Sequence, residues 1–258
     1  MALREHDAVL FDMDGTLIDD SESYREAIRL AAEIALDQPV THEQVREVKR
    51  VPGFNNDWDT TWAVVHWLRE GEIRLPSEDE QESEEYAVLR AIFQTLYLGS
   101  DAWREQSGDD APFRWDEPLM MRETRLIRKH TLDRLSGFRL GIATARPRAE
   151  ALLAVRQHDL DRYFGEQNVV GLEDAEDEKP APDPLLELAR RLDVHRAIYV
   201  GDTINDAMAA LDAGMPFIHV GLEPLADPAV EQQVAYRLGS VNDLADLFAP
   251  VVDLGAER

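Results

Sequence analysis

The sequence contains no cysteine, only three lysines and no long apolar run. Without cysteine the chain cannot form disulfides, thiolate metal sites or a cysteine nucleophile, which agrees with a cytoplasmic location. No stretch approaches the roughly 18 uninterrupted apolar residues of a membrane helix. The first residues also lack the basic patch, apolar run and cleavage site of a signal peptide. We therefore expect a cytoplasmic protein without membrane spans.

Basic residues are also scarce: 27 Lys and Arg stand against 52 Asp and Glu, a net charge of −25. This balance argues against a nucleic-acid partner, because such binding needs basic surface to displace phosphate counterions. An acidic, lysine-poor surface is typical of proteins from salt-accumulating cells, where concentrated salt screens the self-repulsion. We expect a halophilic protein, and an ordinary acidic protein is the alternative.

Short apolar runs bounded by turn or charged residues predict buried parallel strands. These runs are residues 8–11, 140–143, 197–200 and 217–220, with a weaker candidate at 169–170. Apolar residues between them keep helical spacing, as Leu185, Leu188 and Leu192 do. The alternation predicts an α/β fold, a doubly wound, Rossmann-like parallel sheet.

A long segment between the first two predicted strands has the pattern of helices instead. One apolar stripe in it consists of Tyr24, Ala27, Ile28, Ala31 and Ala35. An insertion of this size within an α/β unit predicts a separate, all-helical cap domain. We place the catalytic core at residues 1–18 and 120–258 and the cap at residues 19–119.

Two carboxylates follow the first strand, in the run Asp12-Met13-Asp14-Gly15-Thr16. At positions i and i+2, Asp12 and Asp14 lie on the same side of an extended backbone, and Gly15 allows a sharp turn after them. Ligands of doubly wound sheets bind outside the carboxyl ends of the strands. The pair therefore predicts either a hard cation or a nucleophile with an acid, and a turn capped by aspartate is the alternative.

The second strand runs into Thr144-Ala145-Arg146-Pro147, and the proline indicates the start of a helix. A hydroxyl and free backbone N–H groups at a helix N-terminus form a phosphate site. Arg146 is a candidate for binding a substrate carboxylate or phosphate, and it could instead cap an acidic loop.

Lys179 lies in a proline-rich approach to a helix, where it could balance clustered carboxylates and phosphoryl oxygens. Asp202 and Asp206 follow the strand at 197–200, in the run GDTIND. Together with Asp12 and Asp14 they bring four acids to one sheet edge. These would repel strongly unless a divalent cation neutralised them.

In these four motifs the sequence resembles the haloacid dehalogenase superfamily. The resemblance covers roughly residues 5–18 and 120–225, and the inserted segment is similar to the family's first type of cap, as in phosphoglycolate-phosphatase-like members. It implies that Asp12 attacks phosphorus and forms an aspartyl-phosphate, while Asp14 protonates the leaving alcohol and later activates water. It implies further that Thr144 and Lys179 hold the phosphoryl oxygens.

The resemblance also implies a magnesium ion. Its ligands would be Asp12, the backbone carbonyl of Asp14 and Asp202. Asp206 would bind the ion through water or position Lys179. Carboxylate chemistry agrees, because Mg²⁺ is held by oxygen ligands and stabilises phosphoryl transfer.

These residues predict a magnesium-dependent phosphatase acting on a small phosphomonoester, as a monomer or homodimer. Asp14 disfavours dehalogenases and phosphonate-cleaving relatives, which replace that aspartate. A phosphosugar mutase of the same superfamily and a non-catalytic, phosphate-binding regulatory protein are the alternatives. Phosphoglycolate, histidinol phosphate and sugar phosphates all remain open as substrates.

Substrate contacts are expected from both parts of the chain. In the core we expect them at Gly15, Thr16, Ala145 and Arg146. In the cap, the unusual run VPGFNNDW makes Phe54, Asn55, Asn56 and Trp58 candidates for substrate specificity. The alternative is a loop that anchors the cap core with Trp58 buried.

Overall fold

The computed structural model describes residues 5–54 and 56–248. The chain divides into two compact units: an α/β unit, Met1–Ile18 with Arg125–Arg258, and a helical unit, Asp19–Thr124. Within the described residues, none of the helices combines the length and apolar character needed to span a membrane.

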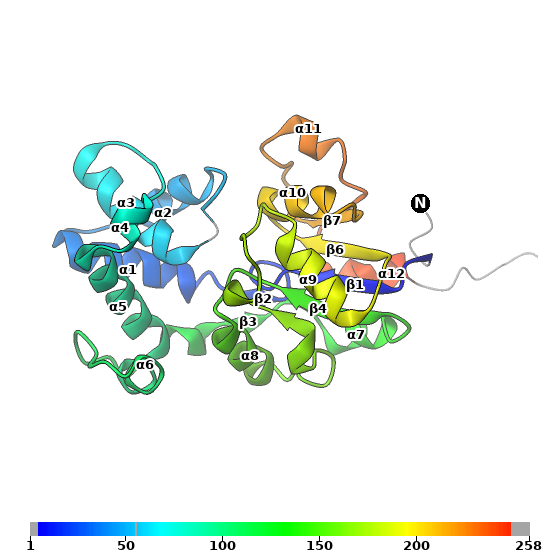
Figure 1. The fold of residues 1–258 in the computed structure, drawn as a ribbon, viewed down its shortest axis with the longest axis horizontal. Coiled ribbons are helices and arrows are strands. Elements are labelled where there is room, and N and C mark those ends of the chain that lie inside the picture. Colours follow the sequence, from blue (N-terminus) through cyan, green and yellow to red (C-terminus); the bar gives the residue numbers. More distant parts are fainter. Residues whose placement is uncertain (1–4, 55, 249–258) are drawn as a thin grey trace, which may run out of the picture. The chain divides into compact units, whose positions relative to one another are not determined.

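A six-stranded parallel sheet forms the centre of the α/β unit, in the order β5-β4-β1-β6-β7-β8 (Figure 1). Its strands are β1 (Ala8–Phe11), β4 (Arg139–Ala143), β5 (Val169–Val170), β6 (Ala197–Gly201), β7 (Phe217–Val220) and β8 (Tyr236–Leu238). β1 is paired on both sides, with Phe11 opposite Ile142 of β4 and opposite Val200 of β6. The residue that follows β1 therefore lies in the middle of the carboxyl edge.

Helices cover both faces of this sheet, which confirms the predicted α/β class. The helices are α7 (Lys129–Arg134), α8 (Arg148–Gln157), α9 (Asp183–Leu192), α10 (Ile204–Asp212), α11 (Pro228–Glu231) and α12 (Leu244–Leu247), with short 3-10 turns η3 (Glu166–Asn168), η4 (Leu172–Asp174) and η5 (Val241–Asp243). Alternate residues of β1 point to opposite faces. Phe11 packs in the core cluster that includes residues of α7, α8 and α12, whereas Leu10 packs with α9 and α10.

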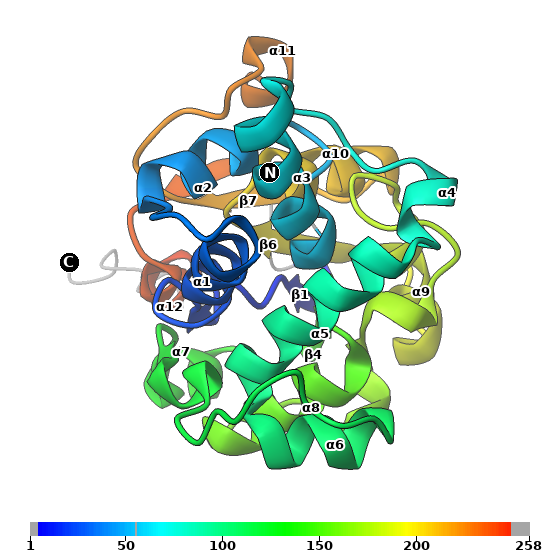
Figure 2. The ribbon, with the colours of Figure 1, turned by 90° about the vertical axis from the view of Figure 1, so that its left-hand side faces the viewer.

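The helical unit has its own core, in which α1 packs against α3 and α5 (the helices are labelled in Figure 2). Its elements are α1 (Tyr24–Leu36), α2 (His42–Lys49), α3 (Asp57–Glu70), α4 (Glu78–Gln81), α5 (Glu84–Leu98), α6 (Ser100–Ser107) and the 3-10 helix η2 (Leu119–Arg122). The buried aromatic rings of Tyr24 and Tyr97 pack with centroids 4.2 Å apart. The apolar stripe predicted from Tyr24 is the buried face of α1.

Two short strands, β2 (Ile18–Asp19) and β3 (Thr124–Arg125), pair where the chain passes between the units. The helical unit reaches Thr124, whereas the sequence pattern places this boundary at residues 119–120. The reason is that Leu119 and Met120 are buried in the core of the helical unit.

Candidate active site

Asp12, Thr144 and Asp202 each follow a neighbouring strand of the parallel sheet, β1, β4 and β6. Backbone hydrogen bonds extend the sheet to these positions. The N–H of Asp12 donates to the carbonyl of Val200 at 2.8 Å, and the N–H of Thr144 donates to that of Val170 at 3.0 Å. The side chains at this edge are thus held by a rigid backbone. Asp12 and Thr144 are buried.

Lys179 is the centre of the buried polar network at this edge. Its Nζ donates to Oδ1 of Asp12 and to Oδ1 of Asp206, both at 2.7 Å, and to the hydroxyl of Tyr199 at 3.2 Å. The Tyr199 hydroxyl in turn donates to the carbonyl of Ala143 at 2.9 Å. Tyr199 was missed by the sequence analysis, because a tyrosine inside an apolar strand is indistinguishable from a core residue.

Burial and like charges shift the titration of this network. Burial, helped by the charge of Asp206, raises the pKa of Asp12 to about 7, although Lys179 opposes the shift. Burial alone would lower the pKa of Lys179, but Asp12 and Asp206 outweigh it and raise that pKa well above its usual value. A strongly perturbed carboxyl beside a specific charge partner is a common mark of a functional site.

Asp206 has a structural as well as an electrostatic role. It is fully buried at the third position of α10, and its Oδ2 accepts the Thr203 N–H at 3.0 Å and the Thr203 hydroxyl at 2.6 Å. The Thr203 hydroxyl accepts the Asp206 N–H in return, which completes a capping box. Because Oδ1 holds Lys179, Asp206 ties the lysine to the start of this helix.

Asp12, Asp202 and Asp206 can each place one carboxylate oxygen within 4.8 Å of the others. Gly15 makes room for this cluster. It has a positive φ of 73°, and a Cβ at this position would overlap the Asp202 carboxylate. The buried Thr16 hydroxyl has no hydrogen-bond partner among the described residues. The hard oxygen donors of Asp12 and Asp202, with Asp206 beside them and an unsatisfied hydroxyl nearby, fit a small divalent cation and its ligands.

Asp14 contacts Arg146, which stands two residues beyond Thr144. The Arg146 side chain is almost completely buried and forms an ion pair with the Asp14 carboxylate. Ala145 lies between Thr144 and Arg146 in the turn before α8, which begins at Arg148 with Pro147 as its N-cap residue. The ion pair thus joins Asp14, in the loop after β1, to the loop after β4 that carries Thr144 and Arg146.

The candidates in the helical unit have local roles there. Phe54 is buried in the helical core. Asn56 caps α3, and its side chain accepts the Trp58 N–H at 2.9 Å. The half-buried Trp58 ring carries the Arg90 guanidinium at 3.8 Å from its centroid. Asn55 lies outside the described residues.

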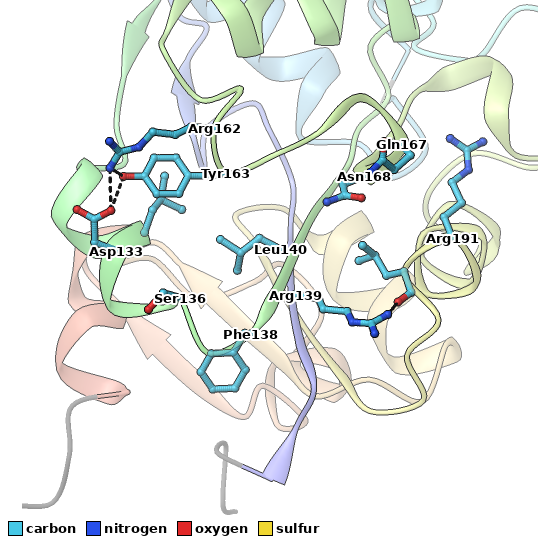
Figure 3. A pocket seen from close by; sticks show the side chains of 12 residues that line it. Asp133, Ser136, Phe138, Arg139, Leu140, Arg162, Tyr163, Gln167, Asn168 and Arg191 are labelled. Carbon is cyan, nitrogen blue, oxygen red and sulfur yellow. Dashed lines mark hydrogen bonds and ion pairs between the residues drawn. The ribbon is translucent and has the colours of Figure 1, made fainter.

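A cavity of about 780 Å³ lies away from these groups, at the amino end of β4 (Figure 3). Arg139, Arg162 and Arg191 line it, and each of them has a protein partner: the Leu192 carbonyl, Asp133 and Asp174, respectively. None of the residues that line it is a predicted site residue.

Comparison with known proteins identifies the family of the chain. Residues 6–214 match the family model described as haloacid dehalogenase-like hydrolase. The phosphoglycolate phosphatase of Salmonella typhi is 30% identical over 226 residues, 81% of this chain and 79% of that protein. The phosphatase Tt82 of Thermococcus thioreducens has a similar structure, with a TM-score of 0.64, 27% identity and coverage of 92% of this chain and 97% of that one. CbbY of Rhodobacter sphaeroides, solved in complex with phosphate, shares the fold at a TM-score of 0.62 and 21% identity, over 93% of this chain and 96% of its own. The chain belongs to the haloacid dehalogenase-like hydrolases and is an enzyme of the phosphatase type.

Proposed function

We propose that this enzyme is a magnesium-dependent phosphatase that hydrolyses a small phosphomonoester through an aspartyl-phosphate on Asp12. The observation that carries the proposal is the position of Lys179. Its ammonium group holds Oδ1 of a buried Asp12 at 2.7 Å, beside Asp202 and Asp206. This fixes one carboxylate at the strand end and places positive charge next to it, as phosphoryl transfer requires.

Magnesium would be held by Asp12, Asp202 and the backbone carbonyl of Asp14. When bound, the ion supplies positive charge to the phosphoryl oxygens and to the clustered carboxylates. Both oxygens of Asp206 already accept hydrogen bonds, from Lys179 and from Thr203. Asp206 therefore acts through Lys179 or through water bound to the ion.

The protein groups divide the hydrolysis into two displacements. In the first, a bond forms between an Asp12 oxygen and phosphorus while the bond to the leaving alcohol breaks, and Asp14 gives that alcohol its proton. In the second, Asp14 takes a proton from water, whose oxygen bonds to phosphorus and releases Asp12 and inorganic phosphate. Lys179 and the hydroxyl of Thr144 hold phosphoryl oxygens in both steps, with Gly15, Thr16 and Ala145 around them.

The substrate class follows from the relatives only as a proposal. Phosphoglycolate is the first candidate, because relatives of about 30% identity that cover most of this chain carry that activity in their names. Its carboxylate would require a positive group besides Lys179, and Arg146 is the candidate in the α/β unit. Alanine substitutions of Phe54, Asn56 and Trp58, assayed on a panel of phosphomonoesters, would show whether the helical unit selects among substrates.

The decisive experiment is hydrolysis of p-nitrophenyl phosphate in molar potassium chloride, with magnesium or with a chelator. We expect release that depends on magnesium and is abolished by Asp12→Asn. The matched control is Asp7→Asn, which changes an exposed aspartate paired with Arg196 at 3.0 Å. Activity that survives Asp12→Asn would refute the assignment of Asp12 as the nucleophile. A requirement for a sugar bisphosphate would mean that the enzyme is a mutase and not a phosphatase.

We also propose that the protein works in concentrated salt inside the cytoplasm, because its net charge is −25. Screening of that charge should raise the melting temperature steeply between low and molar potassium chloride. A melting temperature independent of salt would refute the halophilic assignment.

A further inference from the structure

We propose that Arg146 is the positioning residue of Asp14, holding the carboxyl group in the one orientation from which both proton transfers occur. This assignment rests on the proposed function, in which Asp14 is the acid and base. It gives Arg146 a role that acts through Asp14, besides or in place of the contact with substrate predicted from the sequence.

The geometry is that of a two-pronged clamp. Nε of Arg146 donates to both carboxylate oxygens of Asp14, at 3.0 Å to Oδ1 and 3.0 Å to Oδ2. Nη2 donates to Oδ1 as well. Among the described residues, Oδ1 thus receives two donors, whereas Oδ2 shares one donor with Oδ1. The planar guanidinium fixes the plane of the carboxyl group, which a lysine ammonium could not do.

The clamp is itself held rigidly. The Arg146 side chain is 1% exposed. Its backbone N–H donates to the Thr144 hydroxyl at 3.2 Å, and its carbonyl accepts the Leu172 N–H at 2.9 Å. The loop that carries the proposed phosphate-binding Thr144 therefore also sets the position of Asp14, which lies on a different loop. Burial of a guanidinium is costly unless its partner is retained, so the pair is expected to persist.

The unequal load on the two oxygens suits an acid that must also serve as a base. The less heavily bonded oxygen, Oδ2, is the one that the clamp leaves available for contact with the leaving alcohol and with water. The proton can pass to the leaving alcohol and later return from water without rotation of the group. A misplacement of about 1 Å in such a group can cost 10²-fold in rate.

The test is a double-mutant cycle of Arg146→Gln and Asp14→Asn, measured on two leaving groups. p-Nitrophenolate is a stable anion and leaves without a proton, whereas the alcohol that leaves 2-hydroxyethyl phosphate must be protonated as the bond to phosphorus breaks. We expect Arg146→Gln to slow the first step, followed as alcohol release in a single turnover, about 10–100-fold on 2-hydroxyethyl phosphate and less than about 3-fold on p-nitrophenyl phosphate. The water step, in which Asp14 is the base, should slow for both esters. In the double variant the loss should match that of Asp14→Asn alone, because both changes remove the same step.

Further variants keep the test decisive. Arg156→Gln, which changes an exposed arginine of α8 paired with Glu166 at 3.6 Å, should leave both reactions unchanged. Arg146→Lys keeps the charge but loses the second prong, so it should show the same leaving-group dependence with a smaller loss. If thermal melting shows that Arg146→Gln does not fold, Arg146→Lys replaces it in the test.

Three outcomes would overturn the assignment. Equal losses on both esters in the first step would mean a structural role, and multiplicative losses in the double variant would mean independent action. A rise in KM for phosphoglycolate without a change in kcat on 2-hydroxyethyl phosphate would mean direct binding of a substrate anion. Failure of the proposed function is seen separately, as absence of magnesium-dependent turnover in the unmodified protein, and it would remove the assignment with it.

Discussion

Two acidic side chains of the α/β unit, Asp12 and Glu187, both lie beside basic groups, but their pKa values are shifted in opposite directions. Hydrogen bonds from Arg190 and Arg191 lower the pKa of Glu187 to about 2 on the surface of α9. Burial raises the pKa of Asp12 to about 7, although Lys179 is 2.7 Å away. Solvation, more than the presence of a partner, decides which way each group moves.

The difference separates two uses of charge in one acidic protein. On the surface, carboxylates and arginines form ion pairs that each contribute little but keep the charged form stable. At the sheet edge, carboxylates are brought together where their charges oppose folding, and a lysine offsets only part of that cost. Such an arrangement is retained at sites where reactivity depends on it.

Removal of Lys179 should have the largest effect on this contrast. Lys179→Met leaves Asp12 and Asp206 buried and facing each other without a cation, and we expect a loss of about 3–5 kcal/mol in the free energy of unfolding. Phosphatase activity should fall by at least about 10²-fold. Urea denaturation with chelator and steady-state kinetics with magnesium measure the two effects.

Lys129→Met is the matched control for that change. Lys129 is partly exposed and pairs with Asp159 at 3.2 Å, so its loss should change stability by less than about 0.5 kcal/mol. Similar losses in the two variants would show that the buried network contributes no more than a surface pair.

Removal of the charge of Asp12 should act in the other direction. In the metal-free protein the folded pKa of Asp12 is about 7, above its ordinary value of 3.8. Between these values the folded state binds more protons than the unfolded state, so stability from this group is present at low pH and is lost as pH rises through 7. We therefore expect Asp12→Asn to be more stable than the unmodified protein at pH 8, by about 1–4 kcal/mol.

The pH dependence checks the cause. The advantage of Asp12→Asn should shrink as pH falls from 8 and disappear near pH 4, measured by urea denaturation with chelator. Asp7→Asn should show no such gain, because Arg196 lowers the pKa of Asp7. A gain of equal size at pH 4 and pH 8 would mean that packing, and not charge, separates the variant from the unmodified protein.

The sequence analysis succeeded where strand ends carry unusual residues and failed where a role depends on three-dimensional neighbours. Asp12 and Thr144 were placed at the carboxyl edge because the carboxyl ends of parallel strands meet there. Strand β8 (Tyr236–Leu238) was missed, since three residues with an arginine in the middle do not form an apolar run.

The partners of the site residues were harder to predict than the residues. Tyr199 fits the apolar pattern of β6, so nothing in the sequence shows that its hydroxyl accepts a hydrogen bond from Lys179. Arg146 was predicted to bind a substrate anion or to cap an acidic loop, and its position in the sequence does not show that Asp14 is its partner. Such contacts depend on how two loops pack, which spacing along one chain does not encode.

The smallest expected effect concerns the surface member of the comparison. Glu187 has a folded pKa of about 2, below its ordinary value of 4.5, so its stabilising contribution is present above pH 4.5 and is lost as pH falls through 2. We expect Glu187→Gln to cost about 0.2–1 kcal/mol at pH 7 in low salt, because the carboxylate is near the surface and two arginines can find water instead. Molar potassium chloride should remove most of this loss by screening, whereas the effect of Lys179→Met should persist, since buried charges are screened far less.

Urea denaturation of both variants, in low salt and in molar potassium chloride, measures this difference in salt dependence. If salt weakened both effects equally, the buried network would be open to solvent, and burial could no longer explain why Asp12 and Glu187 shift in opposite directions.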